Sequence, residues 1–203
     1  MLIDADLRKR GLRDRTQIDL FAAEPGPMGV AGPDVSRGVR AMVESVGIGY
    51  HPEHQVVGVD TDSRRARFSN GVEAGYDLLV YVAGHRAPRA VAEAGLVGES
   101  GGVSVDRHTL ATTFDGVYAI GDVTSIPLKL GKPLPKGGVF AHAQAEVVAR
   151  NIERAVTGHG QPKEFNGHGE CFVETGGGKA GFGSGDFYAE PLPQVTLRPP
   201  SRF

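Results

Sequence analysis

The residues whose types and spacing most clearly indicate a binding or catalytic role lie in the segment TTFDGVYAIGDVT, residues 112–124. Its apolar stretch, Gly116–Ile120, predicts a buried strand that runs directly into Gly121 and Asp122. Open α/β folds bind their ligands at the carboxyl ends of parallel strands, so a carboxylate there could accept hydrogen bonds from ligand hydroxyls. A glycine beside it lets the backbone come close to the ligand. A Gly-Asp pair after a strand is also typical of a plain turn, and the spacing leaves both interpretations open.

A second candidate binding segment is LPKGGVFAHAQAEVVARNI, residues 134–152. Its pattern predicts a helix that is preceded by a polar turn. It places Lys136, Gly137 and Gly138 at the helix start. The free N–H groups and the positive end of the helix dipole favour an anionic group at that point. The alternative is a structural helix that binds nothing.

Cys171 is the only cysteine in the chain. A single cysteine excludes an internal disulfide and a zinc site built from several cysteines. Any thiol chemistry therefore needs a partner from outside this sequence. The alternative interpretation of Cys171 is a small apolar residue buried on a strand.

The elements that must position these residues follow from hydrophobic periodicity. Asp77–Ala83 is a continuous apolar run, typical of a strand buried on both faces in a parallel sheet. Strands are also predicted at 16–22, 55–59, 66–69, 72–73, 170–175 and 186–190, with Asn70-Gly71 as a hairpin turn. After Pro191 the tail is predicted to be extended.

Three helices are predicted. They span residues 3–10, residues 34–46 and residues 138–156, and each is followed by a glycine that can end it. The inward-facing residues of the third helix are predicted to be Phe140, Ala143, Val147, Ile152 and Val156. Approximate domain boundaries are expected near residues 75 and 160.

The composition limits the class of protein. The chain has 203 residues, including 30 glycines and 13 prolines, which predicts a globular protein of one to one and a half domains with many loops. The formal net charge of -2 gives no basic stripe, so nucleic-acid binding is not expected. No apolar run is long enough for a membrane span, and the acidic opening MLIDADLRKR does not fit a signal peptide. A cytoplasmic protein is expected.

Taken together, YDLLVYVAGHRAP (76–88), the Gly-Asp segment and the helix of residues 138–156 resemble the second half of the flavin-dependent pyridine nucleotide-disulfide oxidoreductases. The tail ECFVETGGGKAGFGSGDFYAEPLPQVTLRPPSR is similar to the sulfide:quinone oxidoreductase and flavocytochrome c sulfide dehydrogenase branch. The resemblance implies an α/β fold with partial FAD/NAD(P)-binding Rossmann-like domains of the three-layer ββα type and a C-terminal β-rich region. It also implies three parts: a nicotinamide-domain remnant (1–75), the C-terminal part of an FAD domain (76–160) and a C-terminal interface region (161–203).

The resemblance also implies roles for individual residues. Asp122, after Gly121, would hold the ribitol of FAD, and the Val123 backbone would lie near the flavin with the helix start at Gly137-Gly138. Lys136 would add positive charge at the same edge of the ring. Cys171 matches the C-terminal redox cysteine of the sulfide-oxidising members. No metal site is expected.

Some family features are missing. The family binds phosphates on G-x-G-x-x-G turns, and GPMGVAG (26–32) contains a proline and has the wrong glycine spacing for such a turn. The chain is therefore expected to begin on the helix that follows the second such turn, and to lack the partner cysteine that thiol exchange requires.

Weaker candidates carry two interpretations each. His51 and His54 have metal-like spacing, but Pro52 favours a turn. His142 could approach a flavin or lie on the surface. A group of aromatic residues could line a quinone pocket or belong to the core or a subunit interface: Phe172, Phe182, Phe187 and Tyr188.

The expected function is that of the C-terminal part of an FAD-dependent oxidoreductase. Electrons would pass from sulfide, another small reductant or NAD(P)H through the flavin to a quinone or another acceptor. The alternative is a truncated, non-catalytic interaction module that pairs with itself as a homo-oligomer or with a separate chain carrying the N-terminal half. A third possibility is a reductase that uses NAD(P)H with ferredoxin or a disulfide. Attachment to the inner face of the membrane is the alternative to a purely cytoplasmic location.

Overall fold

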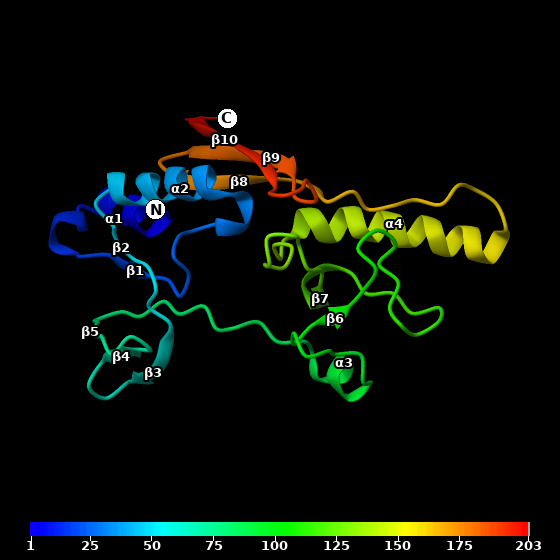
Figure 1. Ribbon diagram of the computed structural model, residues 1–203. Helices are drawn as coiled ribbons and strands as arrows, with labels where there is room; N and C mark the ends of the chain where they lie inside the picture. Colours follow the sequence, from blue (N-terminus) through cyan, green and yellow to red (C-terminus); the bar gives the residue numbers. More distant parts are fainter. Residues whose placement is uncertain (203) are drawn as a thin grey trace. The chain divides into compact units, whose positions relative to one another are not determined.

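The computed structural model describes residues 1–202 and has a mixed α/β architecture (Figure 1). The α-helices are α1 (Leu2–Lys9), α2 (Pro33–Ser45), α3 (Arg89–Glu93) and α4 (Gly138–Thr157), and three short 3-10 turns lie at η1 (Arg13–Arg15), η2 (Gly29–Ala31) and η3 (Gly121–Val123). The strands are β1 (Asp19–Phe21), β2 (Gly49–His51), β3 (Val56–Asp60), β4 (Arg65–Phe68), β5 (Glu73–Gly75), β6 (Val103–Ser104), β7 (Thr124–Ser125), β8 (His168–Gly176), β9 (Lys179–Asp186) and β10 (Gln194–Arg202).

The chain divides into two compact units. The first contains residues 1–83, 172–183 and 196–203, and the second contains residues 84–171 and 184–195. The three-stranded sheet β10-β9-β8 contributes residues to both units. The predicted assignment of residues 1–75, 76–160 and 161–203 to three parts of a larger enzyme stays a prediction.

The first unit begins as a parallel α/β arrangement. Strands β1 and β2 pair in parallel, and α2 is the helix that connects them. The buried stripe Val35, Val39 and Val43 recurs every four residues along α2, as one face of a helix must. Val43 packs with Ile48 and Tyr50 in a small core. The predicted helix at 34–46 is confirmed.

A separate antiparallel sheet follows, in the order β3-β4-β5. The turn between β4 and β5 is Asn70-Gly71, where Gly71 has φ +83° and the Asn70 side chain accepts a hydrogen bond from the Val72 N–H at 3.0 Å. A positive φ is what this turn demands and what glycine supplies without strain. The predicted hairpin is confirmed.

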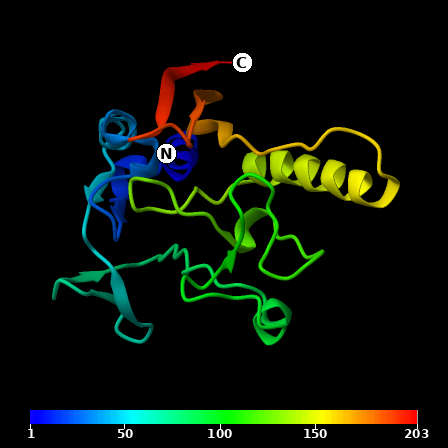
Figure 2. The same ribbon diagram turned by 45° about the vertical axis from the view of Figure 1, so that its right-hand side comes forward.

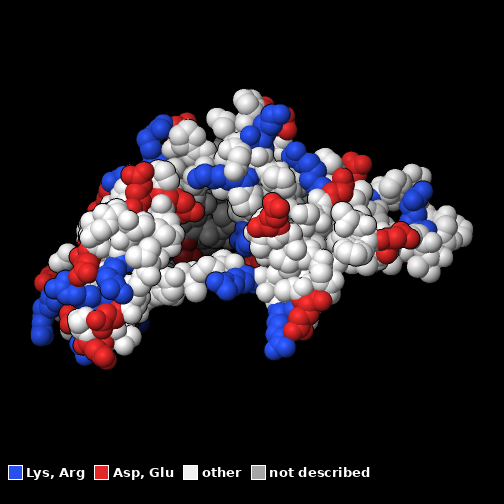
Figure 3. Space-filling model, turned by 60° about the horizontal axis from the view of Figure 1, so that its bottom comes forward, with Lys and Arg blue, Asp and Glu red and all other residues white. Residues whose placement is uncertain are grey.

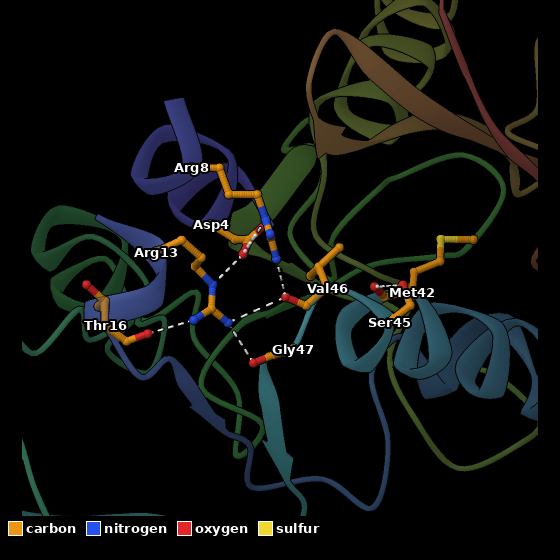
Figure 4. A network of polar contacts seen from close by, with 8 residues as sticks. All are labelled: Asp4, Arg8, Arg13, Thr16, Met42, Ser45, Val46 and Gly47. Carbon is orange, nitrogen blue, oxygen red and sulfur yellow. Dashed lines mark hydrogen bonds and ion pairs between the residues drawn. The ribbon is translucent and has the colours of Figure 1, made fainter. Parts of the chain in front are cut away.

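A buried carboxylate ties α1 to the rest of the first unit (Figure 4). Asp4 accepts hydrogen bonds from Arg8 Nε at 3.0 Å and from Arg13 Nε at 2.6 Å. Arg13 also donates to the carbonyl oxygens of Thr16 at 2.6 Å and Gly47 at 2.7 Å. Burial raises the pKa of Asp4, but the hydrogen bonds and charges of the two arginines outweigh it, and the pKa lies below the ordinary value. This network holds the end of α1 against the loop after α2.

Replacing Asp4 by asparagine is expected to lower the free energy of unfolding at neutral pH by about 2 kcal/mol, because Arg13 loses its charged acceptor but keeps its carbonyl acceptors. The stabilisation from a carboxylate with a lowered pKa is complete above its unfolded pKa of about 4 and is lost as the pH falls below that value. Urea denaturation between neutral pH and about pH 3 measures both effects.

The control is Asp6→Asn on the same helix, because the ion pair of Asp6 with Arg10 is exposed. This change should cost less than about 0.5 kcal/mol. An Asp4→Asn penalty that stays constant from neutral to acid pH would contradict the assigned role of the carboxylate.

The second unit is built around α4, the long yellow-green helix of Figures 1 and 2. The ring of Phe140 packs edge-on against Phe187, with centroids 5.1 Å apart, and against Phe165 at 6.4 Å. Phe140 and Val147 are buried, as predicted. The prediction that Ile152 and Val156 face inward is wrong, because the end of the helix extends beyond this cluster and both side chains are exposed.

The predicted buried strands at 77–83 and 116–120 are wrong for this structure. Residues 77–83 form no strand, and Leu78, Val80 and Val82 are exposed. Residues 116–120 hold only an isolated bridge, between Tyr118 and Ala111. A strand needs hydrogen-bonding neighbours, and neither segment pairs with a strand within residues 1–202.

The C-terminal region is β-rich, as predicted, but its strands differ from those expected. The strand predicted at 170–175 is confirmed within β8, and the turn at Gly177-Gly178 leads into β9. The strand predicted at 186–190 is wrong, because β9 ends at Asp186 and turns follow it. The predicted extended tail forms β10, which pairs with β9.

Basic and acidic side chains are interspersed on the face shown in Figure 3, and neither sign forms a continuous patch there. Within residues 1–202, no helix is both long enough and apolar enough to cross a membrane.

Candidate functional site

The Gly-Asp loop is fixed to α4 by a buried side chain. Gly121 has φ +70°, a left-handed conformation that favours glycine, and its N–H donates to Gln144 Oε1 at 2.6 Å. Gln144 is 1% exposed and lies on α4 one turn after Phe140. A Cβ atom at Gly121 would come within 3.2 Å of the Ala141 Cβ. The loop therefore lies close against the first turns of α4.

Lys136 draws the same loop toward the start of α4. Its Nζ donates to the backbone carbonyl of Asp122 and, at 3.3 Å, to that of Thr124. The carboxylate of Asp122 takes no part in these bonds, and the residue is exposed to solvent. The lysine thus binds the loop through its backbone and leaves the carboxylate available to a ligand.

These residues surround one small recess. Its lining includes four of the six predicted cofactor-binding residues: Gly121, Asp122, Lys136 and Gly137. The other two, Val123 and Gly138, are their neighbours in sequence. The structure therefore brings the two predicted segments together, although residues 124–135 separate them along the chain.

The start of α4 offers unpaired donors at this recess. Gly137 is the N-cap and provides no side-chain cap, and the first turn carries no acidic residue. The N–H groups of Phe140 and Ala141 both donate to the Gly137 carbonyl, at 3.1 Å each, and the Ala141 bond is the first of the α-helical series. An added Cβ at Gly138 would meet no atom within 4 Å, so the space beside the first turn is open. Backbone N–H groups and the nearby ammonium of Lys136 make this a favourable place for a negatively charged or electron-rich group.

Cys171 lies on strand β8, as one interpretation expected, but the residue is exposed. The interpretation of Cys171 as a residue buried on a strand is therefore wrong. Gly169, two residues earlier, packs against the ring of Phe140: a Cβ there would lie 2.3 Å from the ring. Residues two apart in a strand share a face and lie about 7 Å apart. The Cys171 side chain therefore points to the face of β8 that Phe140 covers at Gly169, and Phe140 belongs to the first turn of α4.

The remaining histidine candidates have structural surroundings. His51 bonds to Asp19 Oδ1 at 2.8 Å and stacks on Phe21, and His54 packs edge-on against the same ring. His142 is exposed and pairs with Glu146 at 3.4 Å, which supports the surface interpretation. Within residues 1–202, no group of three or more His, Cys, Asp or Glu side chains is arranged to hold a metal ion.

The aromatic candidates are divided between the two units. Phe187 is buried in the cluster around Phe140. Tyr188 donates to the Arg107 carbonyl at 2.7 Å, and burial raises the pKa of its phenol to about 12, which keeps it protonated as a donor. Phe172 and Phe182 lie 5.2 Å apart, and both belong to the first unit. The core interpretation fits Phe187 and Tyr188.

Gln144 is the site residue that sequence reasoning missed. A signal existed, because a polar residue occupies the stripe between Phe140 and Val147 on the predicted buried face of the helix. Buried polar side chains are retained when they satisfy a partner, here the N–H of Gly121. The segment GPMGVAG (26–32) forms turns and η2, with Met28 at φ +52°.

Comparison with known proteins places these features in a family. The sequence model of the pyridine nucleotide-disulphide oxidoreductases matches residues 5–161. The mitochondrial sulfide:quinone oxidoreductase of Schizosaccharomyces pombe is 34% identical over 141 residues, which cover 66% of this chain and 29% of that protein. The mitochondrial sulfide:quinone oxidoreductase of Dictyostelium discoideum is 25% identical over 180 residues, which cover 86% of this chain and 38% of that protein.

A solved structure confirms the fold. The sulfide:quinone oxidoreductase from the hyperthermophilic bacterium Aquifex aeolicus superposes with a TM-score of 0.83 and 23% identity, over 99% of this chain and 49% of that chain. The predicted α/β Rossmann-type fold is therefore confirmed, and so is the resemblance to the sulfide:quinone oxidoreductase branch. The chain spans half or less of the length of each of these proteins.

Proposed function

The chain belongs to the pyridine nucleotide-disulphide oxidoreductase family, and from that premise we propose that its second unit forms the flavin-ring half of an FAD site. The observation that carries the proposal is the recess where the Asp122 loop, Lys136 and the uncapped start of α4 meet. A flavin ring is polar along one edge and is negatively charged when reduced. The recess offers backbone N–H donors and one ammonium group, which suit both properties. The residues present therefore fit a flavin.

Each residue has a distinct task in this proposal. The Asp122 carboxylate would accept hydrogen bonds from the ribitol hydroxyls, and the backbone from Gly121 to Val123 would hold the flavin nearby. The N–H groups at Gly137 and Gly138 would donate to the pyrimidine part of the ring. Lys136 supplies positive charge and, through its bonds to two carbonyls, keeps the loop in place. A bound flavin supplies the two-electron redox centre that side chains lack.

The residues of this recess are not proposed to bind the phosphates of FAD. The segment GPMGVAG (26–32) forms a turn that includes a 3-10 helix, and its glycine spacing differs from that of a dinucleotide cradle. The pyrophosphate and adenosine of FAD would bind to polypeptide equivalent to the part of the relatives that this chain does not span.

For the donor and acceptor we propose sulfide and a quinone, as in the names of the relatives. A sulfide sulfur that bonds to a thiolate gives a persulfide and releases one proton and two electrons. A quinone that receives both electrons takes up two protons to become the quinol. Cys171 is the thiol that this chain offers, and its exposure lets sulfide reach it. Turnover through a disulfide needs a second thiol, which must come from outside this sequence.

An anaerobic titration tests this proposal. The chain is reconstituted with FAD, and sulfide should bleach the flavin absorbance in the visible region, after which a water-soluble quinone should restore it. A protein that takes up no FAD and stays colourless would overturn the enzyme proposal for this polypeptide alone. Flavin that is bleached by NADH or NADPH but not by sulfide would instead favour the reductase that uses ferredoxin or a disulfide.

A further inference from the structure

The segment that leads into Cys171 is buried at alternate residues. Phe165, Gly167 and Gly169 are buried, and Cys171, the next residue in this alternation, is exposed. Gly167 has φ +76°, which favours glycine, and a Cβ atom there would lie 2.3 Å from the ring of Tyr188. The backbone of this segment therefore lies directly against the tyrosine ring, four residues before the thiol.

Tyr188 connects the segment to the loop of residues 106–110. Its hydroxyl donates a hydrogen bond to the backbone carbonyl of Arg107 at 2.7 Å. The guanidinium carbon of Arg107 lies 3.9 Å from the centre of the Tyr188 ring, within the range of a cation–π attraction. The Nε atom of Arg107 is buried and makes no hydrogen bond within residues 1–202, so this attraction helps to offset the cost of its burial. The ring and the hydroxyl of one side chain thus bind the same loop residue.

A pair of hydrogen bonds joins the same loop and segment a second time. The Phe165 N–H donates to the His108 carbonyl at 2.8 Å, and His108 Nδ1 donates to the Phe165 carbonyl at 3.1 Å. Nδ1 must carry the proton, because a carbonyl oxygen can only accept. The His108 ring also packs edge-on against Tyr188, with centroids 5.6 Å apart. Arg107, His108, Phe165 and Tyr188 together are called the Tyr188 clamp below.

The loop of residues 106–110 is in turn fixed to the Gly-Asp segment. The Ala119 N–H donates to the Leu110 carbonyl at 3.1 Å, and Gly121 follows two residues later. Leu110 is fully buried and has φ +62°, a conformation that is uncommon outside glycine, so packing holds the loop in one shape. The Asp106 carboxylate closes the loop by accepting the N–H groups two and three residues further on, at 3.0 and 2.8 Å. The clamp therefore joins the segment before the thiol to the segment that ends at the recess.

We propose that Tyr188 is a positioning residue for Cys171: through the Tyr188 clamp it sets the distance between the thiol and the recess at Asp122. The proposal rests on the proposed function, in which sulfide electrons pass from this thiol to a flavin in the recess. Cys171, the recess and the clamp all belong to the second unit. A reaction between two bound groups depends steeply on their separation, and a misplacement of about 1 Å can cost about 100-fold in rate.

Spin labelling tests the distance in the chain without flavin. Cys171 is the only cysteine, so a nitroxide attached through sulfur labels this position alone. The label broadens the amide signals of the ¹⁵N-labelled chain with the inverse sixth power of distance, which makes small displacements visible. Tyr188→Phe removes only the hydroxyl. The broadening at residues 121–123 should then fall by at least about twofold, because the segment loses a hydrogen bond that holds it to the loop.

Flavin reduction gives a second readout in the chain reconstituted with FAD. In Tyr188→Phe, sulfide should reduce the flavin about tenfold more slowly than in the unchanged chain, because the thiol is misplaced. Dithionite, which reduces flavin without a thiol, should act at the unchanged rate. A role in stability alone would lower the thermal unfolding midpoint without changing the ratio of the two rates.

Two further variants make the result specific. Tyr76→Phe is the matched control, since the Tyr76 hydroxyl also donates to a backbone carbonyl, that of Asp60 at 3.3 Å, but lies in the first unit. It should change neither the broadening nor the ratio of rates. Tyr188→Leu removes the aromatic ring as well, and should have a larger effect than Tyr188→Phe on both readouts.

Two outcomes would overturn the proposal. One is broadening at residues 121–123 that is the same in Tyr188→Phe and in the unchanged chain, even where sulfide reduces the flavin. The other is equal slowing of the sulfide and dithionite reactions, which would assign Tyr188 to the flavin site as a whole. A chain that takes up no flavin would overturn the proposed function but would leave the distance measurement intact, so the two failures are distinguishable.

Discussion

Replacing Cys171 by serine is expected to slow the sulfide-dependent reduction of bound flavin by at least about 100-fold, which corresponds to about 2.7 kcal/mol in activation free energy. Serine keeps the size of the side chain but cannot form a sulfur–sulfur bond. Cys171 is exposed on β8, so the change should leave packing and stability almost unaffected. Stopped-flow absorbance of the flavin under anaerobic conditions measures the rate.

Thiol chemistry is separated from a structural effect by two comparisons. Thr175→Ser, a conservative change on the same face of β8, should keep the sulfide-dependent rate. The thermal unfolding midpoint of Cys171→Ser should equal that of the unmodified chain. An unchanged rate in Cys171→Ser would contradict a redox role for this thiol and would favour the reductase that uses NAD(P)H with ferredoxin or a disulfide.

Replacing Gly169 by valine is expected to destabilise the second unit by about 3 kcal/mol, at the upper end of the cost of overpacking. A Cβ at this position would lie 2.3 Å and 2.6 Å from two ring carbons of Phe140. Phe140 cannot move away freely, because its ring also packs against Phe187 and Phe165. The first turn of α4 must therefore shift, and with it the N–H groups that we assign to the flavin.

The control is Gly75→Val on β5, where an added Cβ meets nothing closer than 4.0 Å. That change should alter the free energy of unfolding by less than about 0.5 kcal/mol. Chemical denaturation followed by far-ultraviolet circular dichroism measures both variants. Equal stability of the two variants would mean that β8 does not pack on Phe140 as described.

The sequence predicted well those elements whose determinants are local. The Asn70-Gly71 turn needs one glycine with positive φ, and the stripe of Val35, Val39 and Val43 needs only the helical period. The grouping of Asp122 with Lys136 was also expected, because the resemblance to the flavin-dependent family assigns both residues to the same cofactor.

Prediction from the sequence failed for segments whose structure depends on pairing with residues far away in the chain. Residues 77–83 have the composition of a central parallel strand, but composition cannot supply the neighbouring strands, and within the described chain none pairs with them. Gly116–Ile120 fails for the same reason. The exposure of Cys171 also depends on tertiary packing, since a strand pattern does not say which face of β8 is covered.

The role of Gln144 was only partly predictable from the sequence. Its position on the buried stripe of α4 was visible in the sequence, but its partner, the N–H of Gly121, lies 23 residues away. Only the folded loop brings the two together.

The most direct measurement is a map of amide chemical shifts in the ¹⁵N-labelled chain during separate titrations with riboflavin and with ADP. Riboflavin carries the ring and the ribitol of FAD, and ADP carries the other half. Riboflavin should shift the amides of residues 121–123 and 137–138, whereas ADP should leave them unchanged. Shifts at these amides with ADP, or none with riboflavin at saturating concentration, would contradict a flavin-ring site at the start of α4.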